Sequence, residues 1–502
     1  MKIDRFEIIL FLFSIFFLSI LVLHYGPIIN PDTFSYSVYA KEIVEGNKIA
    51  YAYNNDFLSA ANFYYMVVPK PFQIFLSLIA LSIFKSIYSV AFVYIFFASL
   101  IILYSYKIIK IYNKKAALIS PLLLLFNTQF ILSAVKAGSI TIFLALIFPI
   151  IYYLIAWDGK KKANIIIISL LLFLASLTRP EAWFLIFPIF LFFFIKKSKK
   201  KMSLILIPLS VFLASAVWFT MDYLFSKNFL WSLELSKFAK LICVQEMNLG
   251  LFKFFPYLLL QIYLSLNSSA LLIFFSLMGF FFLLKADIKN IFSPLITFPI
   301  MVSLVYLGIT LSGGLFVPRF IFIASFIMVI TAGLGIFYLL ENINQFKKYK
   351  LICFIAIILL LIPSYLIPFL PESINNKLDI TNPASAILKK ESIMQNDIKL
   401  IADFLDKKEG KILAPERRIP QFDYIYGLDY TRFYSFRRMA YLNKSLEEMN
   451  IKYIVYSKED IPSYVYDYFS YLDDRERKVI GNSEIIPVYS IDDITVFMVD
   501  HS

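Results

Sequence analysis

The chain has 502 residues, of which 60% are hydrophobic and 18% aromatic, with a mean hydropathy of +0.74 and a formal net charge of +13. A soluble domain is usually closer to half apolar, so this excess cannot be enclosed in one water-soluble core. The positive charge would suggest nucleic acid in a soluble protein. Here most basic clusters stand at the ends of apolar runs, where Lys and Arg fix topology and meet anionic lipid headgroups. We therefore predict the lipid bilayer, and not nucleic acid, as the partner of this charge.

Eleven segments are apolar and long enough to be read as membrane spans, for which about 20 residues are needed. They are 6–23, 88–109, 116–134, 140–157, 163–177, 182–195, 203–221, 255–284, 291–311, 320–340 and 351–369. No small-residue cleavage site follows the first, which favours an uncleaved span over a signal peptide. The apolar segment 72–84 is too short to cross alone. The sequence thus predicts a polytopic α-helical membrane protein with about 11 to 13 transmembrane helices.

Lysine clusters give the direction of these spans. With a cytoplasmic N-terminus, all the clusters of the membrane region fall on the cytoplasmic side, as the positive-inside rule requires. The clusters lie within 107–115, 160–162, 196–201, 285–289 and 347–350. We expect a multi-pass protein of the cell (plasma) membrane, with its C-terminal domain outside.

The composition changes after about residue 370, where charge rises and long apolar runs stop. We expect a membrane domain over 1–370, including an external loop at 24–71, and a small extracytoplasmic α/β domain over 371–502. The β-rich stretches 411–414, 452–456, 485–489 and 495–499 predict strands. The segments 393–407 and 442–450 predict helices, the first with apolar residues at helical spacing.

Cysteine and histidine are scarce, which limits metal and redox chemistry. Cys353 lies within an apolar run, which argues against a disulfide with Cys243, and the only histidines are His24 and His501. A Cys-based zinc site is therefore not expected, and little room is left for His-ligated metals or a His general base. No metal ligand and no cofactor is assigned, and the sequence leaves the participation of a divalent metal open.

Charged residues at membrane depth are costly and mark functional sites or pairs. Two positions on the predicted external side precede the long helical region. Asp32 follows Pro31 just beyond the first span, and Lys70 stands between two prolines at the mouth of segment 72–84. A helix N-cap is the structural alternative for Asp32, and an ordinary snorkelling lysine is the alternative for Lys70.

Two further positions reach the same side. Arg179 and Glu181 occupy a tight turn between the fifth and sixth spans, and Arg319 follows a glycine turn at the start of the tenth. An ion pair closing a helical hairpin would equally explain Arg179 and Glu181, and Arg319 alone could be an interfacial anchor.

One acid and three cations on one face of an apolar bundle suit the displacement of a polyprenyl phosphate from a sugar. The leaving phosphate gains charge as the glycosidic bond breaks, and fixed cations at a low-dielectric site stabilise that change. The acid can take the proton of the acceptor hydroxyl. Tyr36, Asp56 and His24 are secondary candidates in or beside the external loop.

These residues resemble motifs of the GT-C superfamily of glycosyltransferases. The pattern Asp32-x3-Tyr36-x3-Ala40-x5-Gly46 is similar to the first external loop of that superfamily. Three further elements resemble those of its aminoarabinose-transferase-like and protein O-mannosyltransferase-like group: a Lys-Pro element, an Arg-Pro-Glu-type turn and a late Arg-Tyr element. They are 70–71, 178–181 and 318–320, and the stretch 446–455 resembles an element of the external domain.

The resemblance implies an inverting hexosyl or pentosyl transfer from a polyprenyl- or dolichyl-phosphate sugar to a lipid, glycan or protein acceptor. It implies Asp32 as the catalytic base and Lys70, Arg179 and Arg319 as phosphate or substrate ligands, with Glu181 orienting Arg179 or meeting the sugar. Relatives often carry two adjacent acids where this chain has Pro31-Asp32, so the base assignment stays open, with Asp56 as another acid. A Trp-Trp-Asp motif is absent from the sequence, which argues against the oligosaccharyltransferase branch.

Two other functions remain as alternatives. A transporter or flippase of lipid-linked glycans would place charges near the midplane, often within repeated broken helices, and the sequence shows neither. A non-catalytic subunit of a glycan-assembly complex would keep the architecture and tolerate the loss of Asp32.

Overall fold

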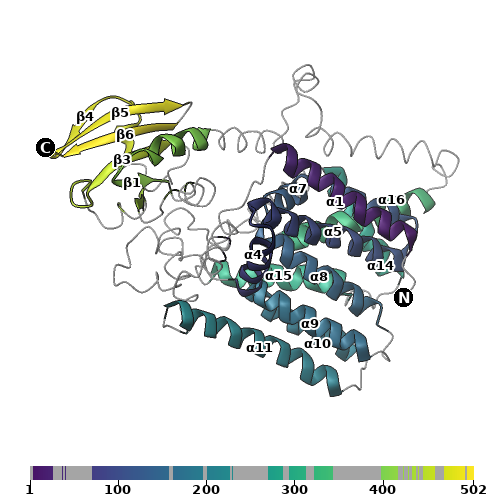
Figure 1. Cartoon of the computed structure of the whole chain (residues 1–502). Helices are drawn as coiled ribbons and strands as arrows, with labels where there is room; N and C mark the ends of the chain where they lie inside the picture. Colours follow the sequence, from purple (N-terminus) through teal and green to yellow (C-terminus); the bar gives the residue numbers. More distant parts are fainter. Residues whose placement is uncertain are drawn as a thin grey trace.

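The computed structural model describes most of the helical region and most of the C-terminal sheet, which form two separate bodies in Figure 1. The described residues are 4–25, 37, 40, 70–157, 162–195, 201–226, 229, 270–286, 293–311, 322–342, 397–415, 422, 428, 432–436, 439, 445–457, 469–491 and 494–501. The expected span at 351–369 and the proposed domain boundary at 370/371 lie outside them.

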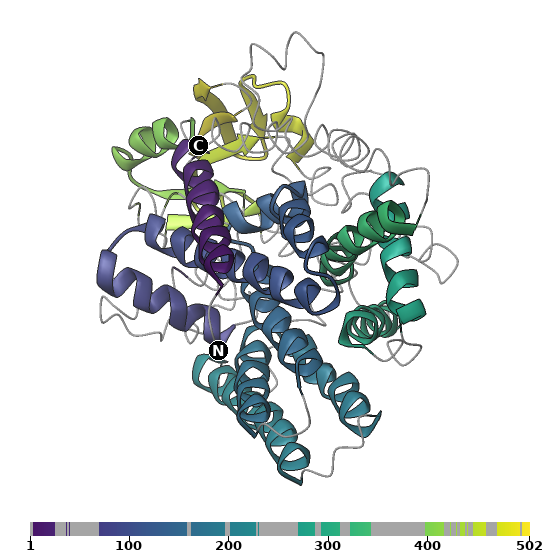
Figure 2. The same cartoon turned by 90° about the vertical axis from the view of Figure 1, so that its right-hand side faces the viewer.

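Helices occupy the segments in which the apolar runs predicted spans. They are α1 (Arg5–Tyr25), α4 (Pro71–Phe84), α5 (Ile87–Tyr112), α6 (Ala116–Leu125), α7 (Thr128–Val135), α8 (Ser139–Ile155), α9 (Lys162–Thr178), the 3-10 helix η2 (Pro180–Leu185), α10 (Ile186–Ile195), α11 (Lys201–Ser226), α14 (Ala270–Ala286), α15 (Pro294–Leu311) and α16 (Phe322–Asn342). Figure 2 shows the helices in three groups. One lies around α1 and α5, a blue and teal group contains α9 to α11, and a green group contains α14 to α16.

Among the described residues, four helices are long and apolar enough to cross a membrane: 5–24, 88–112, 205–223 and 324–341. The broken pair α6 and α7 would add a fifth, and shorter apolar helices such as α8 and α9 complete the bundle. The protein is therefore mostly helical with apolar spans and a small C-terminal sheet, while a count of 11 to 13 spans stays a prediction.

The span expected at 116–134 is broken into two helices, because α6 and α7 meet at a bend of 61°. Asn127 caps α7, since its side-chain oxygen accepts a hydrogen bond from the amide of Phe130 at 3.0 Å. A side chain that caps a new helix favours a break in the old one. The span expected at 182–195 likewise begins as the 3-10 helix η2 before α10.

Ion pairs join the start of α1 to the end of α5. Lys110 lies 2.8 Å from Asp4, and Lys107 lies 3.4 Å from the buried Glu7. α1 and α5 are therefore antiparallel, with the N-terminus beside two of the lysines predicted to be cytoplasmic. Tyr112 contacts Ser293 at 3.1 Å, which brings the start of α15 to this same end.

α8 runs parallel to α5 through the centre of the bundle. Tyr152 near the end of α8 packs against Tyr104 of α5, with ring centroids 5.6 Å apart. Because a helix rises about 1.5 Å per residue, Ser139 at the start of α8 is about 20 Å from Tyr152 along the axis. Side chains from Ser139 to Ile151 are buried on all sides of α8. A helix that is apolar all round belongs to the interior of a bundle.

The outer helices carry the apolar surface that a bilayer would cover. Exposed side chains on α1 include Leu12, Phe16 and Ile20, and exposed side chains on α11 include Ile205 and Phe212. In water such surfaces would be an aggregation hazard, whereas hydrocarbon contact makes them favourable.

Glycines allow α14 and α16 to cross at van der Waals contact. A Cβ added at Gly335 would lie 1.9 Å from the carbonyl oxygen of Phe275, and one added at Gly279 would lie 2.0 Å from that of Thr331. Such close approach of backbones through small residues is typical of membrane helix pairs.

The C-terminal body is a six-stranded mixed sheet in the order β2-β1-β3-β6-β5-β4. The strands are β1 (Lys411–Ala414), β2 (Phe433–Ser435), β3 (Ile451–Ser457), β4 (Lys478–Ile480), β5 (Ser483–Ile491) and β6 (Ile494–His501). β1 pairs in parallel with β2 and β3, and the remaining pairs are antiparallel. The four strands expected from the sequence are confirmed, and β2 and β4 are additional short ones.

Both faces of this sheet are covered, because successive strand side chains point to opposite sides. Val455 and Val496 pack on one face with Ile401 and Leu405 of the helix at 397–406, which confirms the helix expected there. The other face packs a separate apolar cluster that includes Phe497. The sheet body is thus an α/β layer structure with its own core.

The helix expected at 442–450 is wrong over its described part, because 445–450 forms a single hydrogen-bonded turn. Ser445 and Glu448 begin it with reciprocal side-chain-to-amide hydrogen bonds of 3.1 and 2.8 Å. Asn450 ends it in the left-handed conformation, with φ of 52°, and the amide of Ile451 donates back to Leu446. This closing pattern stops a helix after one turn and leads directly into β3.

We predict that Gly335→Ala lowers the melting temperature of the purified protein. Alanine favours an isolated helix over glycine by about 1 kcal/mol. Overpacking against backbone costs about 1–3 kcal/mol. We therefore expect a net loss of stability. Thermal unfolding in one detergent measures the effect, with Leu277→Ala on the exposed side of α14 as the control. An unchanged or raised melting temperature of Gly335→Ala would contradict the close crossing.

Candidate functional site

Lys70 is held at the start of α4 by the proline that follows it. Its backbone is extended, with φ of −111° and ψ of 96°, and Pro71 occupies the first helical position. Proline suits that position because it has no amide hydrogen to donate. The carbonyl of Lys70 accepts from the amides of Gln73 and Ile74, so the lysine is fixed by the first turn and its side chain is buried.

Arg179 stands at the junction between α9 and η2. Its amide still donates to Ala175 at 2.9 Å, while its own φ of −151° and ψ of 131° are extended. A residue before proline is driven from the helical region, so Pro180 ends α9 at this point. The Arg179 side chain is buried, and its guanidinium carbon lies 5.9 Å from the ring centre of Phe143 in α8.

Glu181 binds Arg179 through two hydrogen bonds. Arg179 Nη2 donates to one carboxylate oxygen at 2.8 Å, and Nε donates to the other at 3.2 Å. Glu181 lies in the connection between two apolar helices. Burial would raise the pKa of its carboxyl, but the charge and hydrogen bonds of Arg179 outweigh burial and lower the pKa to about 2. Glu181 is therefore an ionised partner of Arg179 and no proton donor at neutral pH.

Ser139 joins these residues to one another. Its Oγ accepts a hydrogen bond from Lys70 Nζ at 3.0 Å and from Arg179 Nη1 at 3.5 Å. Gln73, on the first turn of α4, donates from Nε2 to the Ser139 carbonyl at 3.1 Å. Four elements thus bring two cations, one carboxylate, one hydroxyl and one amide together. We call Lys70, Gln73, Ser139, Arg179 and Glu181 the cation cluster.

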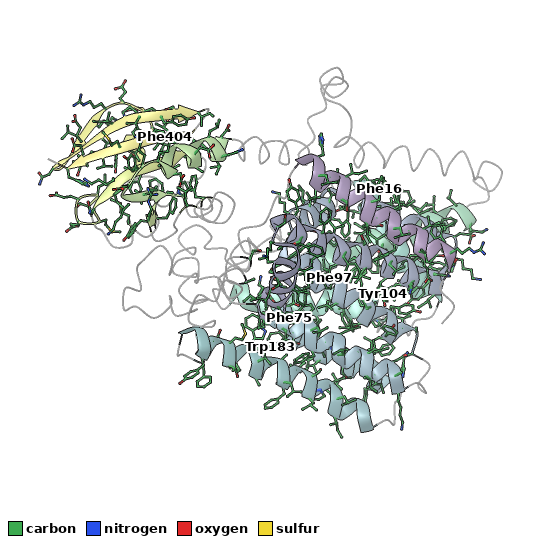
Figure 3. All side chains as sticks on the ribbon, viewed as in Figure 1. Phe16, Phe75, Phe97, Tyr104, Trp183 and Phe404 are labelled. Carbon is green, nitrogen blue, oxygen red and sulfur yellow. The ribbon has the colours of Figure 1, made fainter. Side chains whose placement is uncertain are left out.

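The cation cluster lies at the end of the bundle opposite the N-terminus. Figure 3 shows Phe75 of α4 and Trp183 of η2 at this end, and Tyr104 toward the end where α1 begins. Lys107, whose Nζ lies 5.9 Å from the ring centre of Tyr152, belongs to that other end. The structure therefore brings Lys70, Arg179 and Glu181 together and keeps them apart from Lys107 and Lys110, as the sequence predicts.

Of the five other candidate residues, the structure describes one, His24. His24 is exposed in the last turn of α1, at the same end of the bundle as the cation cluster. Asp32, Tyr36, Asp56 and Arg319 lie outside the described residues, so their roles stay predictions.

Within the described ranges, no group of three His, Cys, Asp or Glu side chains is placed to hold a metal ion.

Sequence reasoning missed Ser139, Gln73 and Asp222. Asp222 is buried near the end of α11, one turn beyond Trp218, whose indole donates to the Ser176 carbonyl at 2.8 Å. Because helix residues four apart share a face, Asp222 faces the end of α9 that leads into Arg179. Its only sequence signal is an acid directly after the predicted span 203–221.

No protein-family model and no curated protein sequence matches the chain. Solved structures do resemble it. ArnT from Cupriavidus metallidurans matches over 98% of this chain and 97% of its own, with 12% identity and a TM-score of 0.55. The same values hold for that ArnT bound to undecaprenyl phosphate. The oligosaccharyltransferase of Archaeoglobus fulgidus covers 91% of this chain and 70% of its own, at 12% identity and a TM-score of 0.49.

At 12% identity, these matches show likeness of fold alone. The ArnT match extends over nearly the whole length of both chains and includes the helical bundle and the C-terminal sheet. The fold of this chain is similar to that of ArnT, a GT-C glycosyltransferase, in agreement with the resemblance carried by its sequence motifs.

Proposed function

We propose that this protein is a membrane glycosyltransferase that transfers a sugar, with inversion, from a polyprenyl- or dolichyl-phosphate donor to an acceptor on the external face of the plasma membrane. The N-terminus is cytoplasmic, and the domain over 371–502 is external. One observation carries the proposal: Lys70 and Arg179 converge on one buried hydroxyl at the end of an apolar bundle.

Two buried cations at one point need a reason, since burying charge is costly. Lys70 and Arg179 both reach the Ser139 oxygen, and Glu181 pairs with Arg179. A phosphate brought by a lipid would accept charge-assisted hydrogen bonds from both cations, and its polyprenyl chain would lie along the apolar surface of the bundle. The ArnT structure bound to undecaprenyl phosphate shows that this fold accommodates such a lipid in that relative.

The chemistry follows from this placement. The acceptor hydroxyl attacks the anomeric carbon, the bond from that carbon to the phosphate oxygen breaks, and polyprenyl phosphate leaves with one more negative charge. Asp32 takes the proton of the attacking hydroxyl, and Lys70, Arg179 and Arg319 stabilise the developing charge. Attack on the side opposite the leaving phosphate inverts the anomeric configuration.

The described structure favours transfer over transport. The buried charged residues of the bundle that the structure describes are Glu7, Lys70, Arg179 and Asp222, and each lies at or near a helix end. Transporters build their sites near the midplane from discontinuous helices. A surface-level cluster suits an enzyme whose acceptor arrives from the external aqueous side.

Asp32→Asn should abolish sugar transfer while leaving donor binding intact. The amide cannot accept the proton of the acceptor hydroxyl, so the loss falls on kcat, and the melting temperature should stay unchanged. The assay uses full-length protein in nanodiscs with a panel of radiolabelled polyprenyl-phosphate sugars and a lipid or protein acceptor fraction. No transfer with any donor, or lipid movement without transfer, would count against the proposal.

Lys70→Ala should raise the KM for the donor about 10- to 100-fold, the value of a hydrogen bond to a charged group. Lys285→Ala is the matched control, because that lysine contacts Tyr338 near the end of α16 and lies outside the cation cluster. Full activity of both Asp32→Asn and Lys70→Ala would show that the site is misassigned.

Glu181→Gln should lower kcat/KM by about 10-fold or more through Arg179, because the neutral amide keeps the shape but weakens two charge-assisted hydrogen bonds. With a carboxyl pKa of about 2, Glu181 does not titrate between pH 5 and 9. Its loss should therefore shift the pH–rate profile downward without changing its shape. A change in the apparent pKa of the acidic limb would contradict the role of Glu181 as an ionised positioning residue.

A further inference from the structure

α4 lies across the direction of α1, α5 and α8, at the end of the bundle that carries the cation cluster (Figure 1). Its first turn contacts Ser139 through Gln73, and two residues after its last residue, Phe84, α5 begins. Since Tyr152 packs beside Tyr104, Ser139 lies only about 6 Å from the start of α5 along the bundle axis. The 14 residues of α4 span about 20 Å, so most of that length runs sideways.

The turn from α4 into α5 satisfies its own polar groups. Lys85 takes the left-handed conformation, with φ of 50°, and its amide donates to the Leu81 carbonyl at 2.9 Å. Ser89, in the first turn of α5, donates from Oγ to the Ala80 carbonyl at 3.1 Å. Backbone groups that are bonded within the protein can lie at membrane depth without water.

The polar and apolar side chains of α4 are arranged opposite to those of a helix that faces water. Gln73 and Ser77 are buried against the bundle, with 0% and 2% exposure. Phe75, Ile79 and Ile83 follow one another four residues apart and are exposed at 53%, 41% and 65%. Residues at this spacing share one face of a helix, so they form an outward apolar stripe. Water outside would disfavour that stripe, whereas hydrocarbon outside favours it.

This apolar stripe leads into surface that the bilayer would cover. Directly after the turn, Tyr88, Phe92 and Phe96 of α5 are also exposed and also stand four residues apart. Phe96 contacts Phe11 of α1, with ring centroids 5.8 Å apart. The exposed apolar surface therefore passes from α4 over α5 to α1, whose outer side faces lipid in a membrane protein.

We propose that α4 is an in-plane membrane helix, which lies along the bilayer in the leaflet nearest the cation cluster with Phe75, Ile79 and Ile83 among the lipid acyl chains. α4 carries no charged residue. It therefore suits the acyl chains better than the headgroup surface, where in-plane helices carry a charged face. Because Lys70 directly precedes α4, the inserted helix also fixes the depth of Lys70. This placement of α4 is independent of the proposed sugar transfer.

The test measures the depth of spin labels in the full chain, reconstituted in phosphatidylcholine–phosphatidylglycerol vesicles. Labels are attached at Phe75→Cys, Ile79→Cys and Ile83→Cys, after Cys243 and Cys353 have been replaced by serine. Each label should relax more strongly with oxygen, which dissolves among acyl chains, than with a water-soluble nickel chelate. The labels at 75 and 83 should lie within about 4 Å of each other in depth, because α4 runs mostly sideways.

α1 supplies the matched control, because it is long and apolar enough to cross the bilayer. Phe16 and Leu23 are each 64% exposed on α1. Labels at Phe16→Cys and Leu23→Cys should therefore differ in depth by about 10 Å, the rise of two turns of a crossing helix. All the labelled positions are exposed, so the melting temperatures should match that of the cysteine-free protein.

Three results would overturn the placement of α4. A depth difference of about 12 Å between the labels at 75 and 83 would make α4 part of a crossing span. Stronger relaxation by the nickel chelate would place the stripe in water. Poor access to both agents, with spin–spin broadening between molecules, would place it against a second copy of the chain. None of these results bears on sugar transfer, and a failure of the transfer assays would leave the depth of α4 unchanged.

Discussion

Two buried cations meet at one neutral hydroxyl, and the proposed site depends on this contact. Lys70 and Arg179 come from different helices and would repel each other, and the Ser139 oxygen accepts from both. Glu181 fixes Arg179 from the other side through two hydrogen bonds. Such an arrangement stores little stability of its own, because each buried charge has given up its hydration. Under the proposed function, this arrangement presents oriented positive charge before the donor phosphate arrives.

The opposite end of the bundle also carries charged residues, but they are arranged differently. Asp4 and Glu7 pair with Lys110 and Lys107, and this neutral set ties α1 to α5. The cations there have protein counterions and contact aromatic rings, so they anchor the bundle. In the cation cluster, Lys70 and Arg179 instead share one neutral oxygen, that of Ser139. The two ends therefore use the same residue types in different arrangements, and the proposed function assigns the donor phosphate to the cation cluster.

Much of this architecture could be predicted because hydrophobicity and charge dominate in a membrane. Apolar runs bounded by lysines gave the helices, and the Lys-Pro and Arg-Pro-Glu elements gave Lys70, Arg179 and Glu181, which the structure brings together. Ser139 could not be predicted in the same way, since a serine at the start of an apolar helix carries no pattern. Its contacts with Lys70, Gln73 and Arg179 arise only when α4, α8 and the junction of α9 with η2 meet.

Other features that the sequence did not predict have local causes. Asn127 followed by Thr128 was a readable capping signal within the apolar run 116–134, and it explains the break between α6 and α7. β2 and β4 are three residues long, too short for an alternating pattern to be recognised.

The most direct measurement of the central claim is a cryo-EM structure of the full chain with undecaprenyl phosphate. We predict phosphate oxygens within about 3.5 Å of Lys70 and Arg179, and a phosphate bound instead at Lys107 and Lys110 would contradict the proposed function.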